Sequence, residues 1–436
     1  MSATSPLLSR RRLLSAAALL PASLGALAAP ATGAAGAAGT AVPTGSAGTA
    51  VPIGGALSDG NDAVWRGIVD LAGGAASPWV VLGTASGMPE VSAANIVRQL
   101  QRRGVRATAL PVSPLLKDRP VDQAVRDPAL VAQVRAARGV FFGGGAQERI
   151  VSSLMPGGVA SPLLEAIWEV YRGGGVVAGT SAGAAIMSQT MFVDAPDLMA
   201  VMKGRLRPGQ EFGPGLGFVD RSVLVDQHFL RRGRIGRLLP LMLRTGHQLG
   251  LGVEEDGGVA MRGLQAEVLG GQALFIDLSE ARSDATLGVF NLQGARISLL
   301  GRGDRLDLAT RTLQPVAHRA RGQVYDPAAP DFKPEYTTQP FQVDMLANGV
   351  LPASMGQLID GSFAEVRGLS FDPRGGDDPA LGALGFEWRL YKPPGCRGWT
   401  SDEGGGEDYS IHRMGLDVRP VRLAQPLYQA WRPLPG

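Results

Sequence analysis

The chain has 436 residues, of which 45% are hydrophobic and 19% are charged, so it can bury the core of one large domain or of two moderate ones. Its formal net charge is +3, but residues 1–28 carry three arginines and no acidic residue, so the rest of the chain is neutral and gives no electrostatic reason to bind nucleic acid or an anionic membrane. The only cysteine, Cys396, excludes an internal disulfide, and the four histidines lack the spacing of a zinc site, so we expect no metal or other cofactor.

The first 28 residues are predicted to be an export signal of the twin-arginine type. Arg10–Arg12 precede a mild apolar stretch over residues 13–28, which ends in the small-residue cleavage pattern Ala26-Leu27-Ala28. A proline and a glycine interrupt this stretch, so a membrane-spanning helix is not expected. Residues 29–48 consist almost entirely of small residues and proline, which predicts a flexible linker. We therefore expect export to the periplasm or the medium, with no membrane attachment after cleavage.

From about residue 50 the pattern alternates between buried strands and helices. In chain order the predicted elements are a strand over 79–83, a helix over 91–103, a strand over 104–110, a helix over 127–138, a strand over 139–142, a helix from Ser161–Pro162 to Gly173, and a strand over 175–178. Repeated βα units predict an α/β fold with a doubly wound, mostly parallel sheet in a domain spanning residues 49–319. Binding sites in such folds lie at the carboxyl ends of the strands.

The composition changes in the last third of the chain. Helical periodicity fades after about residue 265, and short β-like runs such as Ala295–Leu300 appear. From about residue 320 the chain is rich in proline, glycine and aromatic residues. We expect residues 320–436 to form a β-rich C-terminal extension, to which the sequence assigns no role.

The segment Gly179-Thr180-Ser181-Ala182-Gly183 joins the last predicted strand of the α/β region to a helix of small residues. A sharp turn from strand to helix lifts one side chain, here that of Ser181, out of the sheet, and glycines on both sides relieve the crowding. The free N–H groups at the helix N-terminus can stabilise a developing negative charge. This pattern is typical of a nucleophile elbow and indicates hydrolysis by an activated serine.

A nucleophilic serine needs a base and an acid that orients the base. His228 has the best context of the four histidines, because it follows an apolar strand. A second strand ends in three carboxylates, and the residues alone do not choose among Glu254, Glu255 and Asp256. The chain order of an α/β-hydrolase is a weaker alternative, and it would use Ser181, Asp226 and His318.

Four arginines follow His228 closely, namely Arg231, Arg232, Arg234 and Arg237. Such a run is often a solvated helix face, but beside a base it also suits a clamp for substrate carboxylates, which arginine binds in bidentate fashion. Asp226 could pair with a substrate cation. Together these residues predict a substrate that carries both acidic and basic groups.

The sequence resembles the cyanophycinases, serine exopeptidases of peptidase family S51, over about residues 50–315. Four segments carry the resemblance: Pro52–Leu57, Phe142–Gln147, Gly179–Ala184, and Asp226–Phe229 with the arginines that follow. The family implies a fold of the class I glutamine amidotransferase-like, flavodoxin-like type. It also implies a substrate, cyanophycin, which is a poly-aspartate chain with arginine linked to each β-carboxyl, and a product, the β-Asp-Arg dipeptide. The export signal and the C-terminal extension resemble the extracellular members.

The resemblance also implies roles for single residues. Ser181 matches the nucleophile, His228 the base and Glu255 the orienting acid, while backbone N–H groups near Gly144 and at Ala182 match the oxyanion donors. The substrate-binding positions of the family fall on Gln147, Asp226, Gln227, Arg232, Arg234 and Arg237. Ala146 departs from the pattern, because the family commonly has aspartate there.

Two other functions fit the same sequence. An aspartyl dipeptidase of the same fold would act on α-aspartyl peptides, and a non-catalytic protein could keep the pocket and bind the polymer without cleaving it. Relatives also suggest a homodimer. The expected partners are therefore cyanophycin or β-aspartyl-arginine peptides and, as the resemblance implies, a second copy of the chain, and no nucleic acid is expected.

Overall fold

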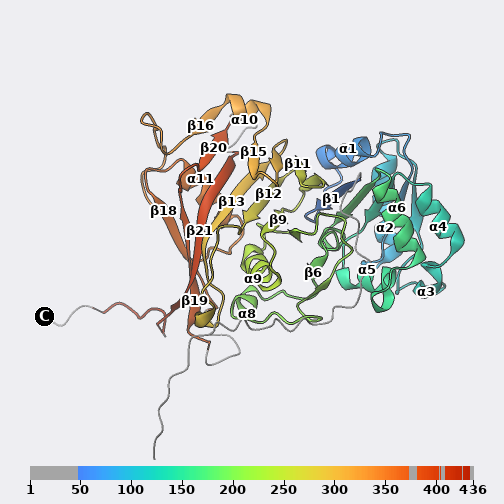
Figure 1. The fold of residues 1–436 in the computed structure, drawn as a ribbon, viewed down its shortest axis with the longest axis horizontal. Coiled ribbons are helices and arrows are strands. Elements are labelled where there is room, and N and C mark those ends of the chain that lie inside the picture. The colour runs from blue at the N-terminus through green and yellow to red at the C-terminus, as the bar shows by residue number, and fades with distance from the viewer. Residues whose placement is uncertain (1–47, 373–380, 402, 404–407, 425, 433–436) are drawn as a thin grey trace, which may run out of the picture. The chain divides into compact units, whose positions relative to one another are not determined.

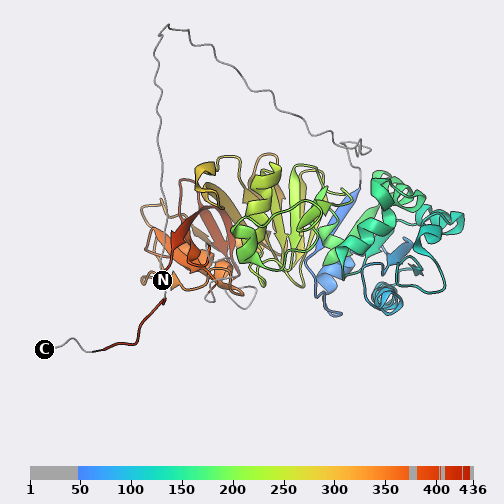
Figure 2. The same cartoon turned by 90° about the horizontal axis from the view of Figure 1, so that it is seen from below.

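The structure, a computed structural model, describes residues 48–372, 381–401, 403, 408–424 and 426–432. The predicted export signal, and the predicted linker apart from Gly48, lie outside the described residues. No helix in the described part of the chain is long and apolar enough to cross a membrane. Figures 1 and 2 show the ribbon from two directions.

Nine strands of the described residues form a first sheet. In pairing order they are β15 (Thr312–Gln314), β14 (Arg305–Asp307), β11 (Gln265–Gly270), β10 (Gly258–Arg262), β1 (Thr49–Ile53), β5 (Val176–Thr180), β4 (Gly139–Phe142), β2 (Trp79–Leu82) and β3 (Ala107–Leu110). The five strands from β1 to β3 are parallel, and β10, β11, β14 and β15 continue the sheet in antiparallel fashion. The order β3-β2-β4-β5 is that of a flavodoxin-like fold, which confirms the predicted α/β class.

Helices cover both faces of the parallel strands, as a doubly wound sheet requires. Neighbouring residues of a strand point to opposite faces, so Phe141 packs with α1 (Asp62–Leu71) and α2 (Pro89–Gln101), whereas Phe142 packs on the other side. The helices on that side are α4 (Pro128–Arg135), α5 (Gln147–Leu154) and α6 (Pro162–Arg172). The predicted ends of α6 are confirmed, because Ser161 Oγ accepts from Leu164 N and Gly173 is the C-cap.

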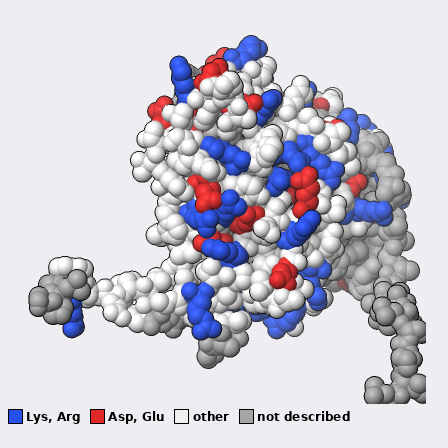
Figure 3. Space-filling view, turned by 60° about the vertical axis from the view of Figure 1, so that its left-hand side comes forward, with Lys and Arg blue, Asp and Glu red and all other residues white. Residues whose placement is uncertain are grey.

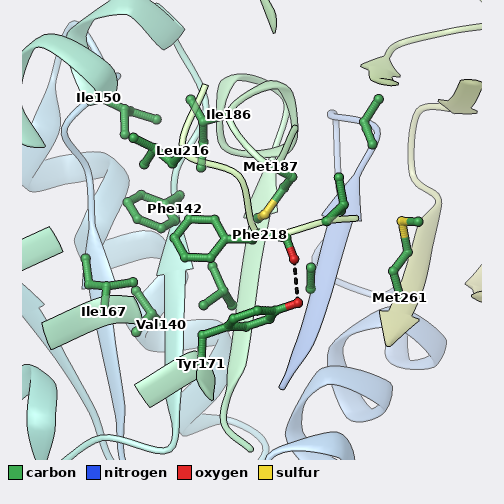
Figure 4. Packing of buried hydrophobic residues seen from close by; sticks show 14 of the residues in the cluster. Val140, Phe142, Ile150, Ile167, Tyr171, Ile186, Met187, Leu216, Phe218 and Met261 are labelled. Atoms are coloured by element: carbon green, nitrogen blue, oxygen red, sulfur yellow. Dashed lines mark hydrogen bonds between the residues drawn. The ribbon is translucent and has the colours of Figure 1, made fainter. Parts of the chain in front are cut away.

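Figure 4 shows the core between these helices and the sheet. The rings of Phe142 and Phe218 lie 6.3 Å apart, and the ring of Tyr171 meets Phe218 edge-on at 5.6 Å. The hydroxyl of Tyr171 donates to the carbonyl oxygen of Phe218, so a buried polar atom is satisfied within the apolar cluster. Val177 of β5, the strand that leads to Ser181, belongs to the same apolar cluster.

A second sheet contains strands from both sides of residue 320. Its main path is β17 (Phe341–Gln342), β18 (Glu365–Ser370), β19 (Leu384–Tyr391), β21 (Ser410–Arg422), β13 (Leu292–Gly301), β12 (Gln272–Asp277), β9 (Leu249–Val253) and β8 (Val223–Gln227). Off this path β20 (Arg397–Thr400) pairs with β21, and β16 (Gln323–Tyr325) pairs with β20. The expected β-rich character of the C-terminal region is confirmed. Figure 1 shows its orange and red strands continuing the yellow strands β12 and β13.

The remaining elements are short or lie against the second sheet. They are α3 (Val121–Ala124), the 3-10 turns Pro156–Gly158 and Ala285–Leu287, α7 (Ala182–Ala185), β6 (Thr190–Phe192), α8 (Leu198–Met202), β7 (Phe212–Pro214), α9 (Ile235–Thr245), α10 (Ala317–Arg321) and α11 (Val350–Ile359). Helices α8, α9 and α11 contribute to the apolar core of the second sheet. The strand predicted over 104–110 begins only at Ala107, because Gly104 has φ +80° in the turn after α2.

Candidate active site

Ser181 stands on a sharp turn between β5 and α7, as the sequence predicts. Its φ of 53° and ψ of −110° are strained for a residue with a side chain. The two flanking glycines are required by space, because a Cβ on Gly179 would lie 2.4 Å from the carbonyl oxygen of Gly183, and one on Gly183 would lie 2.4 Å from that of Phe142. The turn therefore holds the hydroxyl out of the sheet at the carboxyl end of β5.

The hydroxyl of Ser181 begins a chain of two hydrogen bonds. Its Oγ lies 2.9 Å from Nε2 of His228, and Nδ1 of the same ring lies 2.6 Å from Oε1 of Glu255. An ionised carboxylate can only accept, so the proton of the neutral ring sits on Nδ1 and leaves the lone pair of Nε2 facing the hydroxyl. The geometry thus brings together one candidate from each predicted strand end.

The carboxyl end of β1 joins the three segments that carry these side chains. Three successive backbone carbonyls accept one hydrogen bond each, from Ser181 N to Ile53 O (2.9 Å), from His228 N to Gly54 O (2.7 Å) and from Asp256 N to Gly55 O (2.8 Å). β5 belongs to the first sheet, whereas β8 and β9, which lead to the histidine and the carboxylates, belong to the second. The candidate site therefore lies where the two sheets meet at β1.

Gly55 lies directly against the imidazole of His228. A Cβ at this position would be 2.2 Å from Cε1 and 2.4 Å from Nε2, and the backbone has φ +108°. Only glycine can therefore occupy the position while the ring stays in place. The sequence alone assigns no role to this residue, although the Gly54-Gly55 pair after a short strand is a signal of close backbone approach.

Changing Gly55 to alanine is expected to lower kcat by roughly 100-fold, because the methyl group would push the imidazole away from the Ser181 hydroxyl. Steady-state kinetics on a short soluble peptide substrate would measure the loss. Gly74→Ala is the matched control, since Gly74 has φ +84° but open space around its Cβ position. The control should share the backbone strain and keep normal turnover. Equal activity of the two variants would contradict the positioning role.

Backbone strain gathers at this site. Within the described residues six non-glycine residues have positive φ, and four of them line the junction at β1, namely Ala56, Ser181, His228 and Asp256. Such conformations cost of order 1–3 kcal/mol each and persist where the surroundings over-determine them, often at functional sites. The three hydrogen bonds to the carbonyls at the end of β1 and just after it hold Ser181, His228 and Asp256 in these conformations.

The three carboxylates that the sequence left open have separate contacts. Glu255 faces His228, and its second oxygen lies 3.2 Å from Nε of Arg231. Glu254 accepts from the backbone N–H groups of Leu230 and Arg231. The carboxylate of Asp256 instead accepts from Ser58 N, Ser58 Oγ and Asn61 Nδ2. Of the three, Glu255 alone contacts the imidazole.

The pKa of His228 is lowered from its ordinary value of 6.5. Burial of the ring is the main cause, and the nearby charges of Arg232 and Arg234 lower it further, while the hydrogen bond to Glu255 opposes the shift. The imidazole therefore stays neutral, and able to accept a proton, to a more acidic pH than a solvated histidine.

The acid limb of the kcat/KM profile is therefore expected to have its midpoint below pH 6.5. Activity requires the neutral imidazole, so it should hold at pH 7 and fall only as pH drops through the lowered pKa of His228. Arg232→Gln removes one charge that lowers this pKa, so the midpoint should move upward in that variant. A wild-type midpoint above 6.5 would contradict the assignment of His228 to this limb.

The two expected oxyanion donors belong to residues beside Ser181 in the fold. Ala182 is the first residue of α7, and a Cβ on Gly144 would be 3.3 Å from Cβ of Ser181 and 3.9 Å from its Oγ. Within the described residues neither N–H donates to a backbone carbonyl. Ala146, the departure from the family pattern, closes the same loop through its N–H, which donates to Ala85 O.

Asp226 and Arg237, two expected substrate contacts, pair with each other instead. Asp226 is 1% exposed and accepts two hydrogen bonds from Arg237, at 2.6 and 2.7 Å, and Arg237 is itself buried. The charge of Asp226 is thus paired inside the protein in this structure, and its contact with a substrate cation stays a prediction. The alternative set with His318 is not formed either, since that histidine lies on α10 and the serine hydroxyl contacts His228.

The other expected substrate residues surround the site. Arg232 is half exposed, while burial lowers the pKa of Arg234 to about 10 and leaves it cationic at neutral pH. Gln147 donates to the carbonyl oxygens of Phe192 and Val193. Gln227 is 3% exposed, and its Oε1 has no hydrogen-bond partner among the described residues. Within the same residues no group of His, Cys, Asp and Glu is arranged to hold a metal ion.

Comparisons with known proteins show the family of the chain. A model of peptidase family S51 matches residues 59–269, which include the serine, the histidine and the glutamate of the site. The cyanophycinase of Trichormus variabilis is 30% identical over 268 residues, which cover 57% of this chain and 81% of that protein. The cyanophycinase of a Nostoc species is 34% identical over 204 residues, covering 43% and 63%. A crystal structure of a peptidase from an acI-B1 actinobacterium has a TM-score of 0.41 and 17% identity, covering 63% of this chain and 96% of that chain.

Proposed function

Because the chain belongs to peptidase family S51, we propose that it is an exported serine exopeptidase that degrades cyanophycin to β-Asp-Arg dipeptides through an acyl-enzyme on Ser181. The observation that carries the proposal is the hydrogen-bonded chain from Ser181 through His228 to Glu255. The relatives named above are cyanophycinases, which supports cyanophycin as the substrate. The charges around the site also fit a polymer that carries both guanidinium and carboxylate groups.

In the first step His228 Nε2 takes the proton of Ser181 as Oγ attacks the scissile carbonyl. The imidazolium that forms keeps its Nδ1–H bond to Glu255, whose charge stabilises it. The N–H groups of Ala182 and Gly144 would receive the oxyanion. His228 then returns the proton to the leaving amine, and water, activated by the same histidine, hydrolyses the acyl-enzyme and releases the dipeptide.

Substrate recognition would use Arg232, Arg234 and Gln227. The two guanidinium groups suit the α-carboxylates that each arginyl branch of the polymer carries. The buried Oε1 of Gln227, which lacks a partner among the described residues, can accept from an N–H group of the substrate and so recover a lost hydrogen bond. Asp226 has an indirect role, because its ion pair with Arg237 fixes the end of β8 beneath Arg234.

The decisive experiment adds the full chain to a suspension of cyanophycin and follows both the turbidity and the masses of the released products. Clearing with release of β-Asp-Arg would support the proposal. Cleavage of α-aspartyl dipeptides with an unchanged suspension would favour the aspartyl dipeptidase instead, and binding without any cleavage would favour the non-catalytic alternative. Export and dimerisation stay predictions, which cell fractionation and sedimentation would test.

A further inference from the structure

The outer face of the second sheet is charged along three neighbouring strands. Buried and half-buried residues alternate along β18 and over most of β19, and Asp417 and Arg419 flank the buried Val418 in β21. Val366, Trp388 and Val418 therefore enter the apolar core while their neighbours on each strand point outward. Figure 3, which brings this side of the molecule forward, shows basic and acidic side chains intermixed on the surface. None of the expected site residues belongs to these strands.

Three arginines and three carboxylates form a connected lattice on this face. Arg367 bonds Glu365 (2.6 Å) and Glu387 (2.9 Å), Arg389 bonds Glu365 and Asp417 (3.1 Å), and Arg419 bonds Glu387 (2.9 Å). We name these six residues the charge lattice. It carries no net charge, and the side chains of its arginines are 37%, 38% and 65% exposed in chain order. Its carboxylates are 16–22% exposed, less than the arginines, and the set as a whole has no overall attraction for a polyanion or a polycation.

The lattice also borders a hollow in the surface. A groove of about 400 Å³ is lined by four residues of the lattice, Arg367, Glu387, Arg389 and Asp417, among others. Asp284 and Asn291, from the segment between β12 and β13, also line it. Arg367 and Arg389 lie directly opposite each other in the β18–β19 register. Like charges in that position are destabilising, so the arrangement is not the one that sheet stability alone would favour.

We propose that the charge lattice and its groove bind the chain of the zwitterionic polymer itself, outside the catalytic site. This inference rests on the proposed function for the identity of the polymer. Its occupant is a polymer with one carboxylate and one guanidinium on each branch, whose groups can exchange ion pairs with the lattice.

The spacing of charges supports this occupant. Residues two apart on a strand, such as Glu365 and Arg367, repeat at about 6.7 Å on one face. An extended poly-aspartate backbone has the same repeat, so its arginyl branches on one side also recur at about 6.7 Å. Surface ion pairs contribute only about 0–1 kcal/mol each to stability, so stabilisation is a weak explanation for the whole lattice.

The test measures sedimentation of the full chain with insoluble cyanophycin granules, using Ser181→Ala so that the polymer stays intact. In that background Glu365, Arg367, Glu387 and Arg389 are all changed to glutamine, which leaves the net charge unchanged. The apparent Kd for granules is expected to rise roughly tenfold through loss of the second contact. The matched control changes two exposed ion pairs elsewhere to glutamine, Arg135–Glu169 and Arg305–Glu267, and should bind like its parent.

A second readout separates this inference from the proposed function. With Ser181 restored, the four-glutamine variant should clear granules more slowly but cleave a short soluble oligomer of β-Asp-Arg units within about twofold of wild type. If the wild type cleaves neither substrate while granule binding still depends on the lattice, the proposed function fails and this inference stands. Equal granule binding by the parent and the four-glutamine variant, or no binding by either, would overturn it.

Should that variant not fold, Arg419→Glu at the most exposed position decides, with roughly threefold weaker binding expected and unchanged binding overturning the inference.

Discussion

Changing Ser181 to alanine is expected to lower the turnover of cyanophycin by roughly 10⁴-fold or more, the usual scale for loss of a triad nucleophile. The variant lacks the only hydroxyl that lies 2.9 Å from Nε2 of His228 among the described residues, so no acyl-enzyme can form. Release of β-Asp-Arg, followed by mass spectrometry at matched enzyme concentration, measures the loss.

The control for this change is Ser152→Ala, which removes a hydroxyl from the exposed face of α5 and should leave turnover unchanged. Both variants should keep the melting temperature of the wild type within a few degrees, because the imidazole is the one side chain that Ser181 bonds in the described part of the chain. Near-normal turnover by Ser181→Ala would refute the assignment of the nucleophile.

Changing Glu255 to glutamine is expected to lower kcat by roughly 10³–10⁴-fold. The amide removes the negative charge that stabilises the imidazolium, and its NH₂ group can donate to Nδ1 and so place the ring proton on Nε2. That tautomer cannot accept the proton of Ser181. The loss should appear in kcat more than in KM, because the glutamate acts on the base and not on the substrate.

Glu254→Gln is the matched control for this second change. Glu254 is the adjacent carboxylate, but it accepts from the backbone N–H groups of Leu230 and Arg231 and does not touch the imidazole. Its replacement should lower stability modestly and reduce kcat far less than Glu255→Gln does. A larger loss for Glu254→Gln would mean that the orienting acid had been assigned to the wrong member of the pair.

Much of the fold follows from local patterns that a sequence can display. The parallel strands β2 and β4 are continuous buried runs, and α6 begins at a serine cap with proline after it and ends at a glycine. The turn at Ser181 is local in part, because a Cβ on Gly179 would meet Gly183 four residues along, whereas one on Gly183 would meet Phe142 of β4. The apolar runs and the helix caps depend on neighbours within a few residues, so their prediction needs no knowledge of distant contacts.

The pairing of strands that are distant in sequence could not be predicted in this way. β8 and β9 have the same apolar pattern as the strands of the first sheet, yet they belong to the second. The apolar pattern of β12 and β13 likewise does not show that β13 pairs with β21, or that β21 pairs in turn with β19. An apolar run states that a strand is buried, but it does not state which neighbour buries it.

The sequence by itself determined the α/β class, the strained serine turn and the histidine at the end of a strand, because each is set by short-range sterics and by apolar periodicity. Tertiary structure alone decided the rest. It brought segments from both sheets to hydrogen-bond the carbonyls of Ile53, Gly54 and Gly55. It also packed Gly55 against the imidazole and paired Asp226 with Arg237 inside the protein. These contacts join residues up to two hundred positions apart, and only the folded chain brings such groups within hydrogen-bonding distance.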